Sequence, residues 1–437
     1  MNPMRIGLLG LGTAGGGTYQ ILLRNREEIA RRAGREIHVV TAAVRDLDKA
    51  KAKFGLDLRL TTNPEYVVDA PDVDIVVELM GGIEPARSLI LAAIRKGKHV
   101  VTANKALLAL HGNEIFSEAQ KYGVMVAFEA AVAGGIPIIK ALREGLTANR
   151  IQWVAGIING TSNFILTRMR DEGASFADAL AEAQKLGYAE ADPTFDIEGI
   201  DAAHKLTIMA AIAFGVPMKF DQAYTEGISK LTAADIQYAE EFGYRIKLLG
   251  ICRRTDHGFE LRVHPTLIPE RQLIANVDGV MNAILVRGDA VGSTLYYGAG
   301  AGAEPTGSAV VADLVDVTRM HTADPDHRVP HLAFQPDRLS DLNVVPIEGV
   351  VTSYYLRLRA LDRPGVLADV TRILADNGIS IEAMLQREPA EGEEQVDVIF
   401  LTHRTLESSM NAAIAKIEAL TSIAGPAVRI RMESLAS

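Results

Sequence analysis

Apolar residues in the first third of the chain form short runs, separated by longer stretches with helical spacing. Runs rich in β-branched residues are typical of strands, and apolar residues three and four positions apart are typical of amphipathic helices. Alternation of the two predicts βαβ units and a parallel sheet covered on both faces. The predicted strands are 5–9, 37–44, 73–79, 99–102 and 124–128.

The middle of the chain has a mixed pattern. The sequence predicts a helix after Pro137, a strand at 151–158, several alanine-rich helices and an alternating strand around 259–263. This mixture of elements is typical of an α+β domain. We therefore predict an α+β substrate domain over 136–299.

Prolines then mark a boundary, at Pro325, Pro330, Pro336 and Pro346. Proline disfavours helices and strands, so 322–350 is predicted to be a linker. Beyond it the pattern gives, in order, a strand (354–361), helix (364–377), strand (379–386), turn (389–394), strand (395–402), helix (406–420) and strand (428–432). That βαββαβ order predicts a ferredoxin-like domain over 351–437.

Composition narrows the class of protein. The 437 residues carry 45 Lys and Arg against 55 Asp and Glu, a net charge of −10, which argues against nucleic-acid and anionic-membrane partners. The single Cys252 cannot form an intramolecular disulfide, so a reducing, cytoplasmic location is expected. The most apolar long stretch, 123–139, contains Glu129 and Pro137 and is shorter than the run of about 18 to 20 residues that spans a bilayer.

A glycine-rich turn follows the first predicted strand and opens a helix. It consists of Gly10, Leu11, Gly12, Thr13, Ala14 and Gly15. In this context GxGxxG predicts a dinucleotide site, because the first glycine permits the turn, the second admits the pyrophosphate and the third allows close helix packing. The helix N-terminus supplies N–H donors to the phosphates. A glycine turn without a ligand is the simpler alternative.

The residue after the second strand bears on the choice of cofactor. An acid there binds the ribose hydroxyls of NAD, whereas an arginine accepts the extra phosphate of NADP. Arg45 precedes Asp46 here, further past Gly15 than the usual interval of about 20 residues. Arg45 favours NADP and Asp46 keeps NAD open, while a solvated loop charge is the alternative for Arg45.

A lysine follows the strand at 99–102. Lys105 comes just after the carboxyl end of that strand, where ligands of open α/β sheets bind. The alternative is a solvated lysine.

A second charged group lies at the start of an apolar helix. Asp201 and Lys205 are four residues apart and therefore share a helix face. A surface ion pair is the common explanation. However, Glu190 and Asp196 precede the pair and the helix continues as an apolar run, 206–214. A buried helix with charges at its start is a candidate site.

These motifs together resemble a known family. The glycine turn, Thr102-Ala103-Asn104-Lys105, Asn159-Gly160-Thr161-Ser162-Asn163, 187–205 and the tail domain resemble homoserine dehydrogenases with a C-terminal ACT domain, over essentially the whole chain. The resemblance implies a Rossmann domain (1–135, completed by about 300–321), a substrate and dimerisation domain (136–299) and an ACT regulatory domain (351–437). It also implies NAD(P)-dependent interconversion of L-homoserine and L-aspartate 4-semialdehyde, in threonine, methionine and isoleucine biosynthesis.

The resemblance further assigns roles to residues. Lys205 would be the catalytic acid/base, with Lys105 contacting cofactor and substrate and Asp201 orienting Lys205 or the substrate. Glu190 would hold the substrate amino group, and Gly187 and Asp196 would also contribute to substrate binding. The chemistry agrees, because oxidising a carbinol requires a base for its proton. A lysine serves if burial and a second ammonium lower its pKa.

Three more sites follow from the same resemblance. Glu129, Val132, Gly134 and Ile136 match a segment that binds a monovalent cation such as Na⁺, although a plain glycine turn is the alternative. The glycine run ending at Gly302 would approach the nicotinamide. The ACT domain would bind L-threonine as an effector or act only in dimerisation, and the chain would form a homodimer or homotetramer.

Other functions remain open at this point. A metal hydrolase would use His264, His321, His327 and His331, but the last three lie in or beside the proline-rich segment without a ligand motif, and we expect them to be solvated. A non-catalytic NAD(P) and amino-acid sensor would not need both Lys105 and Lys205. Another NAD(P)-dependent amino-acid dehydrogenase is the nearest alternative among enzymes.

Overall fold

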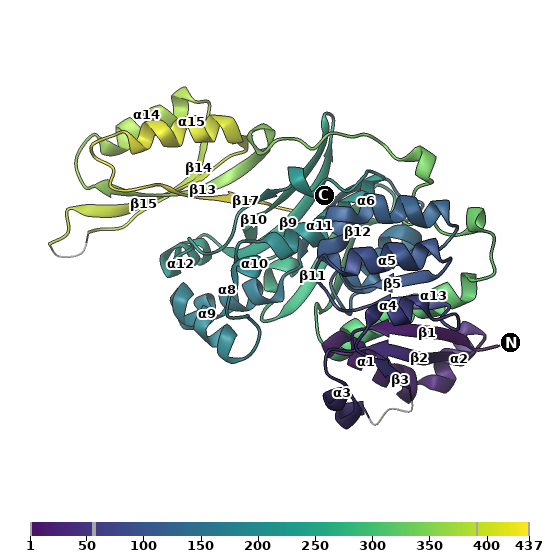
Figure 1. The fold of residues 1–437 in the computed structure, drawn as a ribbon. Helices are drawn as coiled ribbons and strands as arrows, with labels where there is room; N and C mark the ends of the chain where they lie inside the picture. Colours follow the sequence, from purple (N-terminus) through teal and green to yellow (C-terminus); the bar gives the residue numbers. More distant parts are fainter. Residues whose placement is uncertain (1, 55–57, 390–391, 436–437) are drawn as a thin grey trace. The chain divides into compact units, whose positions relative to one another are not determined.

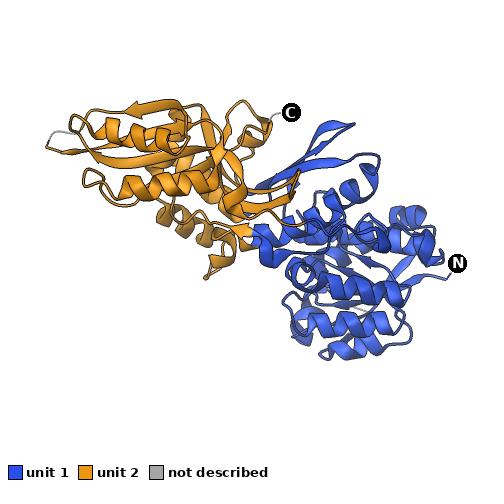
Figure 2. Cartoon of the chain, turned by 90° about the horizontal axis from the view of Figure 1, so that it is seen from above, with its two compact units in different colours: residues 1–160, 201–223, 280–342 blue, residues 161–200, 224–279, 343–437 orange. Residues whose placement is uncertain are grey.

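The computed structural model describes residues 2–54, 58–389 and 392–435, which form two compact units (Figures 1 and 2). Unit 1 comprises residues 1–160, 201–223 and 280–342, and unit 2 comprises 161–200, 224–279 and 343–437. Neither unit is a continuous stretch of sequence. The predicted middle domain, 136–299, contributes to both units, and its boundaries stay a prediction.

Unit 1 contains a six-stranded parallel sheet. Its order is β3-β2-β1-β4-β5-β6, with every pair parallel. The strands are β1 (Met4–Leu9), β2 (Ile37–Ala43), β3 (Arg59–Thr61), β4 (Ile75–Glu78), β5 (His99–Thr102) and β6 (Val126–Ala127). The order reverses between β1 and β4, which opens a ligand crevice at the carboxyl ends of the strands. The predicted Rossmann arrangement is confirmed.

Helices cover both faces of this sheet. They are α1 (Thr13–Arg24), α2 (Arg26–Ala33), α3 (Leu47–Phe54), α4 (Pro64–Asp69), α5 (Ala86–Arg95), α6 (Lys105–Lys121) and α13 (Ala303–Met320). Side chains of α1, α2 and α13 share one core with Ile6 and Leu8 of β1. Successive strand residues point to opposite faces, and a Cβ at Gly7 would meet Val67 of α4, so α4 covers the other face.

Helix α13 joins α1 through glycines, although it is distant in sequence. A Cβ at Gly17 would lie 2.0 Å from the Ala303 carbonyl oxygen, and one at Gly307 would lie 2.7 Å from the Thr18 nitrogen. Only glycine permits such a close approach of two backbones. The segment predicted to complete the first domain thus packs on its first helix.

The rest of unit 1 is an antiparallel sheet with further helices. Strands β12 (Gly292–Ala299), β11 (Met281–Gly288) and β7 (Ile151–Ile157) are neighbours in that order. The helices are α7 (Ile138–Lys140), a π-helical turn at Ala141–Gly145 and α11 (Ile200–Phe214), whose residues from Asp201 onward belong to unit 1. Residues 201–214 of α11 are all buried, as their apolar sequence predicts.

The proline-rich segment has little regular structure. Within the described residues 322–346 there are two 3₁₀ turns, Pro325–His327 and Pro336–Arg338, and one bridge from Val344 to Phe259. The expectation of solvated histidines is wrong for His331. Its Nε2 accepts the Val126 N–H at 3.1 Å and its ring stacks on Phe116, so tertiary packing recruits it.

Unit 2 is built on a long antiparallel ribbon of β9 (Tyr244–Thr255) and β10 (Gly258–Pro269). Around it lie α8 (Gly160–Glu172), α9 (Phe176–Lys185), α10 (Thr194–Ile197), β8 (Tyr224–Thr225) and α12 (Ala233–Glu241). The alternation at 259–263 is indeed a strand, but its polar positions are buried too. Glu260, Arg262 and His264 lie inside unit 2 and bond to one another.

The tail of unit 2 has the predicted βαββαβ order. It comprises β13 (Val351–Leu361), α14 (Val366–Asp376), β14 (Ile381–Gln386), β15 (Gln395–Thr402), β16 (Thr405–Leu406), α15 (Glu407–Glu418) and β17 (Val428–Met432). The sheet order is β17-β13-β15-β14, with both helices on one face (Figure 1). The predicted turn at 389–394 includes residues 390 and 391, which lie outside the described residues.

The last strand of the tail belongs to two pairings. Strand β17 is antiparallel to β13 of the tail and also parallel to β10 of the ribbon, where Thr266 pairs with Arg431. The tail is therefore hydrogen-bonded into the rest of unit 2 through its own final strand.

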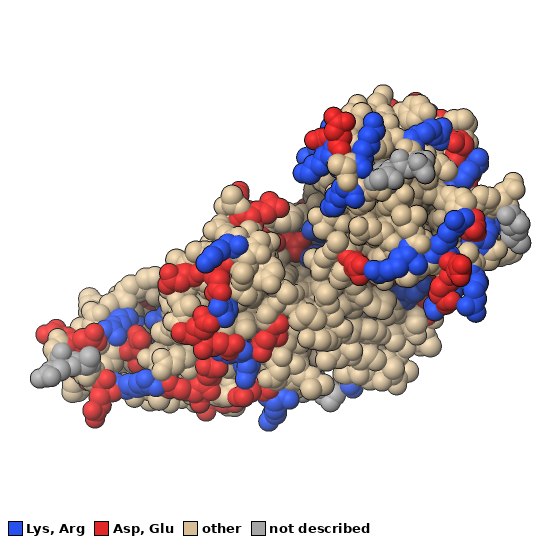
Figure 3. Space-filling view, turned by 90° about the horizontal axis from the view of Figure 1, so that it is seen from below, with Lys and Arg blue, Asp and Glu red and all other residues tan. Residues whose placement is uncertain are grey.

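No helix among the described residues is long and apolar enough to cross a bilayer. On the face drawn in Figure 3, basic side chains lie among widely spread acidic ones.

Candidate active site

The glycine turn of unit 1 has the geometry of a pyrophosphate site. Gly10 has φ +101°, and a Cβ at Gly15 would lie 2.1 Å from the Gly10 carbonyl oxygen, so both positions require glycine. A Cβ at Gly12 would meet nothing within 4 Å, which leaves open space beside the backbone. Helix α1 begins at Thr13 and presents its N-terminus there. These residues fit a dinucleotide phosphate.

The two charged residues after β2 have different surroundings. The Asp46 carboxylate accepts the Lys49 N–H at 2.9 Å and so caps the first turn of α3. Arg45 beside it is exposed. Asp46 therefore has a local structural task, which leaves Arg45 as the better candidate for a phosphate contact.

Lys105 is held at the carboxyl end of β5 by its neighbours. The Thr102 hydroxyl donates to Glu78 at 2.7 Å and accepts the Asn104 N–H at 3.1 Å. The Asn104 side chain then accepts the Leu107 N–H and caps α6, whose first residue is Lys105. These bonds fix the turn of Thr102, Ala103 and Asn104 and thereby the position of Lys105.

Glu78 is a residue of this region that the sequence analysis missed. It is fully buried at the end of β4, and its carboxylate also accepts the N–H groups of Met80 and Gly81 at 2.8 and 3.0 Å. The available signal was a lone acid at the end of an apolar strand.

Two lysines meet one carboxylate in unit 1. Asp201 lies 2.7 Å from the Nζ atom of Lys205 and 3.1 Å from that of Lys105. Lys205 also donates to the Ile158 carbonyl at 2.8 Å, and the Asn159 amide donates to Asp201 at 2.9 Å. Asp201 and Lys205 are buried, whereas the Lys105 side chain is 37% exposed. The partners from β7's end, Ile158 and Asn159, could not be assigned from sequence.

This cluster contains one acidic side chain and two basic side chains. Burial would raise the pKa of Asp201, but the Lys205 and Lys105 ammonium groups, with hydrogen bonds from Lys205 and Asn159, hold it well below its usual range. One carboxylate therefore contacts two ammonium groups, and one of the two lysines, Lys105, is accessible to solvent.

The predicted substrate loop lies in unit 2. The Thr161 hydroxyl donates to the Tyr188 carbonyl at 2.7 Å, and the Ser162 hydroxyl donates to the Asp196 carbonyl at 2.9 Å. Gly187 has φ +77°, and the Glu190 side chain is exposed while its carbonyl accepts the Gln184 amide. The first turn of α8 thus holds this loop at both ends.

The predicted cation segment is buried in unit 1. Glu129 accepts the N–H groups of Ile139 and Lys140 at 2.9 and 2.8 Å and donates its own N–H to Asp313 at 2.8 Å. Burial raises the pKa of Glu129 to about 7, and burial together with Glu129 raises that of Asp313 to about 8. Glu129 and Asp313 are both buried, and carboxyl oxygens are ligands that hard cations take.

The other members of that segment form a tight turn. Val132, Gly134 and Ile136 are buried, and a Cβ at Gly134, which has φ +48°, would lie 2.4 Å from the Gly300 carbonyl oxygen. Gly302 precedes α13 with φ +136°, where only glycine is comfortable.

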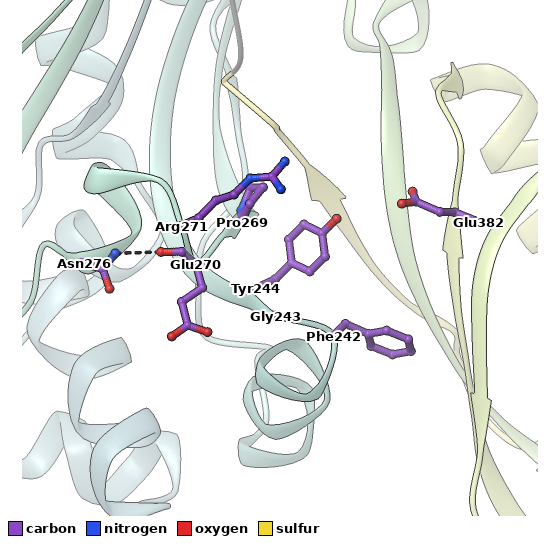
Figure 4. A pocket seen from close by; sticks show the side chains of 8 residues that line it. All are labelled: Phe242, Gly243, Tyr244, Pro269, Glu270, Arg271, Asn276 and Glu382. Carbon is purple, nitrogen blue, oxygen red and sulfur yellow. Dashed lines mark hydrogen bonds between the residues drawn. The ribbon is translucent and has the colours of Figure 1, made fainter.

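A separate cleft in unit 2 has a volume of about 670 Å³ (Figure 4). Tyr244, Arg271 and Glu382 are among the residues that line it. It contains none of the residues predicted from the sequence, so cavity shape and charged clusters point to different places.

Comparison with known proteins agrees with the motifs. The family model for the homoserine dehydrogenase NAD-binding domain matches residues 10–129, that for homoserine dehydrogenase matches 137–315, and that for the ACT domain matches 354–421. A homoserine dehydrogenase of Pseudomonas aeruginosa is 63% identical, with all of both chains covered.

Solved structures give the same result. A crystal structure of a homoserine dehydrogenase from Thiobacillus denitrificans is 73% identical with a TM-score of 0.96, covering 100% of this chain and 99% of that one. A hyperthermophilic archaeal homoserine dehydrogenase in complex with NADPH is 27% identical with a TM-score of 0.62, covering 72% of this chain and 98% of that one.

Proposed function

This chain belongs to the homoserine dehydrogenase family and is an NAD(P)-dependent oxidoreductase, and we propose that it interconverts L-homoserine and L-aspartate 4-semialdehyde in the biosynthesis of threonine, methionine and isoleucine. The observation that carries the proposal is the group of Lys105, Asp201 and Lys205. This group brings two ammonium groups onto one carboxylate in the unit that also contains the dinucleotide turn, which supports the proposal.

Lys205 is the proton-transferring residue in this proposal. The bound NAD(P) supplies or accepts the hydride. During aldehyde reduction negative charge develops on the carbonyl oxygen, and the Lys205 ammonium gives that oxygen a proton. In the oxidation the neutral amine of Lys205 takes the carbinol proton. Its bonds to Asp201 and the Ile158 carbonyl fix the position of Nζ throughout.

Lys105 and Glu190 have supporting roles. Lys105, the more exposed lysine, adds positive charge where the alkoxide forms and contacts both cofactor and substrate. Glu190, exposed on the loop of unit 2, binds the substrate ammonium group, with Gly187 and Asp196 shaping the same loop.

Purified protein with L-homoserine and NADP or NAD tests the activity. Lys205→Ala should lower kcat by about a thousandfold, because general acid–base groups contribute roughly 10² to 10⁴ in rate. Lys96→Ala, in an exposed ion pair with Asp69, is the matched control and should keep wild-type turnover. Undiminished turnover in Lys205→Ala would overturn the assignment.

We propose that NADP is the preferred cofactor because Arg45 is exposed after β2 while Asp46 caps α3. Arg45→Ala should raise the KM for NADP about tenfold, the loss of one charge-assisted contact, and leave that for NAD unchanged. Equal effects on both cofactors would contradict this preference.

We also propose a monovalent cation at Glu129, Val132, Gly134 and Ile136. The support is the buried pair of Glu129 and Asp313, because burial disfavours their ionised forms and a bound cation would stabilise those forms. Activity of desalted protein should depend on added Na⁺, with a weaker response in Glu129→Gln.

We propose that L-threonine binds the ACT domain and lowers activity. Deletion from Ser353 would be an unsuitable test, because it removes β17 and its pairing with β10. A point change in the β13–α14 turn, Asp362→Ala, should weaken the threonine response and keep turnover in its absence. A homodimer or homotetramer and a cytoplasmic location stay predictions, and size-exclusion chromatography with light scattering checks the first.

A further inference from the structure

A third lysine is buried in unit 2, away from the two described above. Lys247 lies in β9 between Ile246 and Leu248, and the residue is 1% exposed. Its ammonium donates to the Asn163 side-chain oxygen at 3.2 Å, the Val277 carbonyl at 2.6 Å and the Asp278 carboxylate at 3.0 Å. An ammonium has three N–H groups, and each has an acceptor here.

These bonds connect α8 to the turn before β11. The Asn163 amide group donates to the carbonyls of Val277 and Gly279, both at 3.0 Å. The Gly279 N–H donates to the Thr167 hydroxyl, also at 3.0 Å. The first two turns of α8 are therefore bonded to residues 277–279, and Lys247 is bonded to both segments.

The cost of burying this charge favours a positioning role over a stabilising one. Asp278 faces Lys247 and also pairs with Arg170 of α8 at 2.8 Å, while Arg245 of β9 lies on the same side. Burial lowers the pKa of Lys247 to about 8, opposed by Asp278, and Asp278 has its pKa lowered to about 2. Buried ion pairs often add little to stability, whereas they can fix one arrangement of a core.

The same turn of α8 holds the substrate loop. Thr161 and Ser162 donate to the carbonyls of Tyr188 and Asp196, and both lie within two residues of Asn163. A shift of Asn163 would move both donors together. The loop between them carries Glu190.

We propose that Lys247 is a positioning residue for the substrate loop, because its ammonium fixes Asn163 and thereby the two hydroxyl groups that hold that loop. The proposal rests on the proposed function of Glu190 in binding the substrate ammonium. Lys247 is too deeply buried to contact the substrate itself.

Lys247→Met tests this role, because it keeps the length of the side chain and removes the charge and all three donors. We expect the KM for L-homoserine to rise about tenfold, with kcat and the KM for NADP within about twofold of wild type, the pattern of lost ground-state binding. Lys230→Met, at an exposed lysine of unit 2, is the matched control and should leave all three constants unchanged.

A pH profile separates positioning from simple structural damage. In the wild type the KM for L-homoserine should rise above pH 8, as Lys247, which faces Asp278, Arg170 and Arg245, loses its proton. Lys247→Met should lack the part of this rise that comes from Lys247.

The outcomes separate this inference from the proposed function. A raised KM in Glu190→Gln with a wild-type KM in Lys247→Met overturns the inference alone. An unchanged KM in Glu190→Gln overturns the assigned role of Glu190. If Lys247→Met does not fold, Thr161→Val tests the same link from the loop side, and a wild-type KM there overturns the proposal.

Discussion

Two groups of buried charges differ in their exposure and in how their basic and acidic side chains are paired. In unit 1 the single carboxylate of Asp201 serves both Lys105 and Lys205. In unit 2 the guanidinium of Arg431 contacts two carboxylates, Glu407 at 2.5 Å and Glu226 at 2.8 Å. A neighbouring arginine, Arg262, likewise contacts Glu260 and Glu433 at 2.8 and 2.5 Å.

This difference distinguishes charges that are available for catalysis from charges that stabilise the fold. In unit 2 each group also contains a second arginine, because Arg429 contacts Glu407 and Arg253 contacts Glu433 and Glu260. Two guanidinium groups thus face two carboxylates in each group, and Arg431 and Arg262 are 1% exposed. In the lysine cluster two ammonium groups contact one carboxylate, and the Lys105 side chain is 37% exposed. A partly exposed lysine within a buried charge cluster, rather than the presence of buried charge, therefore marks the candidate site.

Removing Arg431 from its ion pairs in unit 2 should give the largest loss in the free energy of unfolding. Arg431→Met leaves Glu226 without its cation and Glu407 with Arg429 alone, and removal of one partner from a buried pair costs roughly 3 to 5 kcal/mol. Urea unfolding followed by circular dichroism measures the loss. A change below 1 kcal/mol would show that this group does not support unit 2.

Protonation of Glu433 should give the next largest loss of stability. Although burial raises the pKa of this carboxyl group, Arg262 and Arg253 lower it from an ordinary value of 4.5 to about 2. A lowered folded-state pKa gives stability that is complete above pH 4.5 and is lost as the pH falls toward 2, about 3 kcal/mol in all. Unfolding curves between pH 6 and 3 should show this slope, and it should be smaller in Glu433→Gln.

Changes in the group of Lys105, Asp201 and Lys205 should affect the rate of the reaction rather than the stability of the fold. Asp201→Asn keeps the shape but removes the charge that holds both ammonium groups, and we expect kcat to fall about a hundredfold. Thermal unfolding should shift little in comparison. A large loss of stability with normal kcat would assign Asp201 a structural role and remove the difference between the lysine cluster and the arginine groups of unit 2.

An exposed pair should give the smallest change. Arg24 and Glu304 join α1 to α13, but both side chains are 57% exposed. Such pairs contribute roughly 0 to 1 kcal/mol. Arg24→Ala should therefore leave the urea midpoint almost unchanged, and a larger effect would mean that exposed charges also hold α13 in place.

Sequence patterns predicted the elements with local signatures. The runs at 5–9, 99–102 and 395–402 became β1, β5 and β15 with almost the predicted bounds, because strand propensity and turn residues are local properties. The spacing of Asp201 and Lys205 correctly predicted their contact for the same reason.

Long-range contacts were not predictable in this way. The bond from Asn159 to Asp201 and the one from Lys247 to Asn163 join elements far apart in the chain, and no spacing rule relates them. The buried polar face of β10 was missed because alternation shows which residues share a face but not what covers it. The interleaving of the two units has the same cause.

The pairing of β17 sets a time order on folding in the cell. Residues 428–432 are synthesised after every other strand described, and they pair both with β13 of the tail and with β10. Synthesis proceeds at about 5 to 20 residues per second, and domains generally fold as their chain emerges. Unit 1 ends at residue 342 and can fold before β17 is synthesised, whereas the pairing of β10 with β17 waits for residues 428–432. A stop before residue 428 would leave this strand edge unpaired and exposed to aggregation.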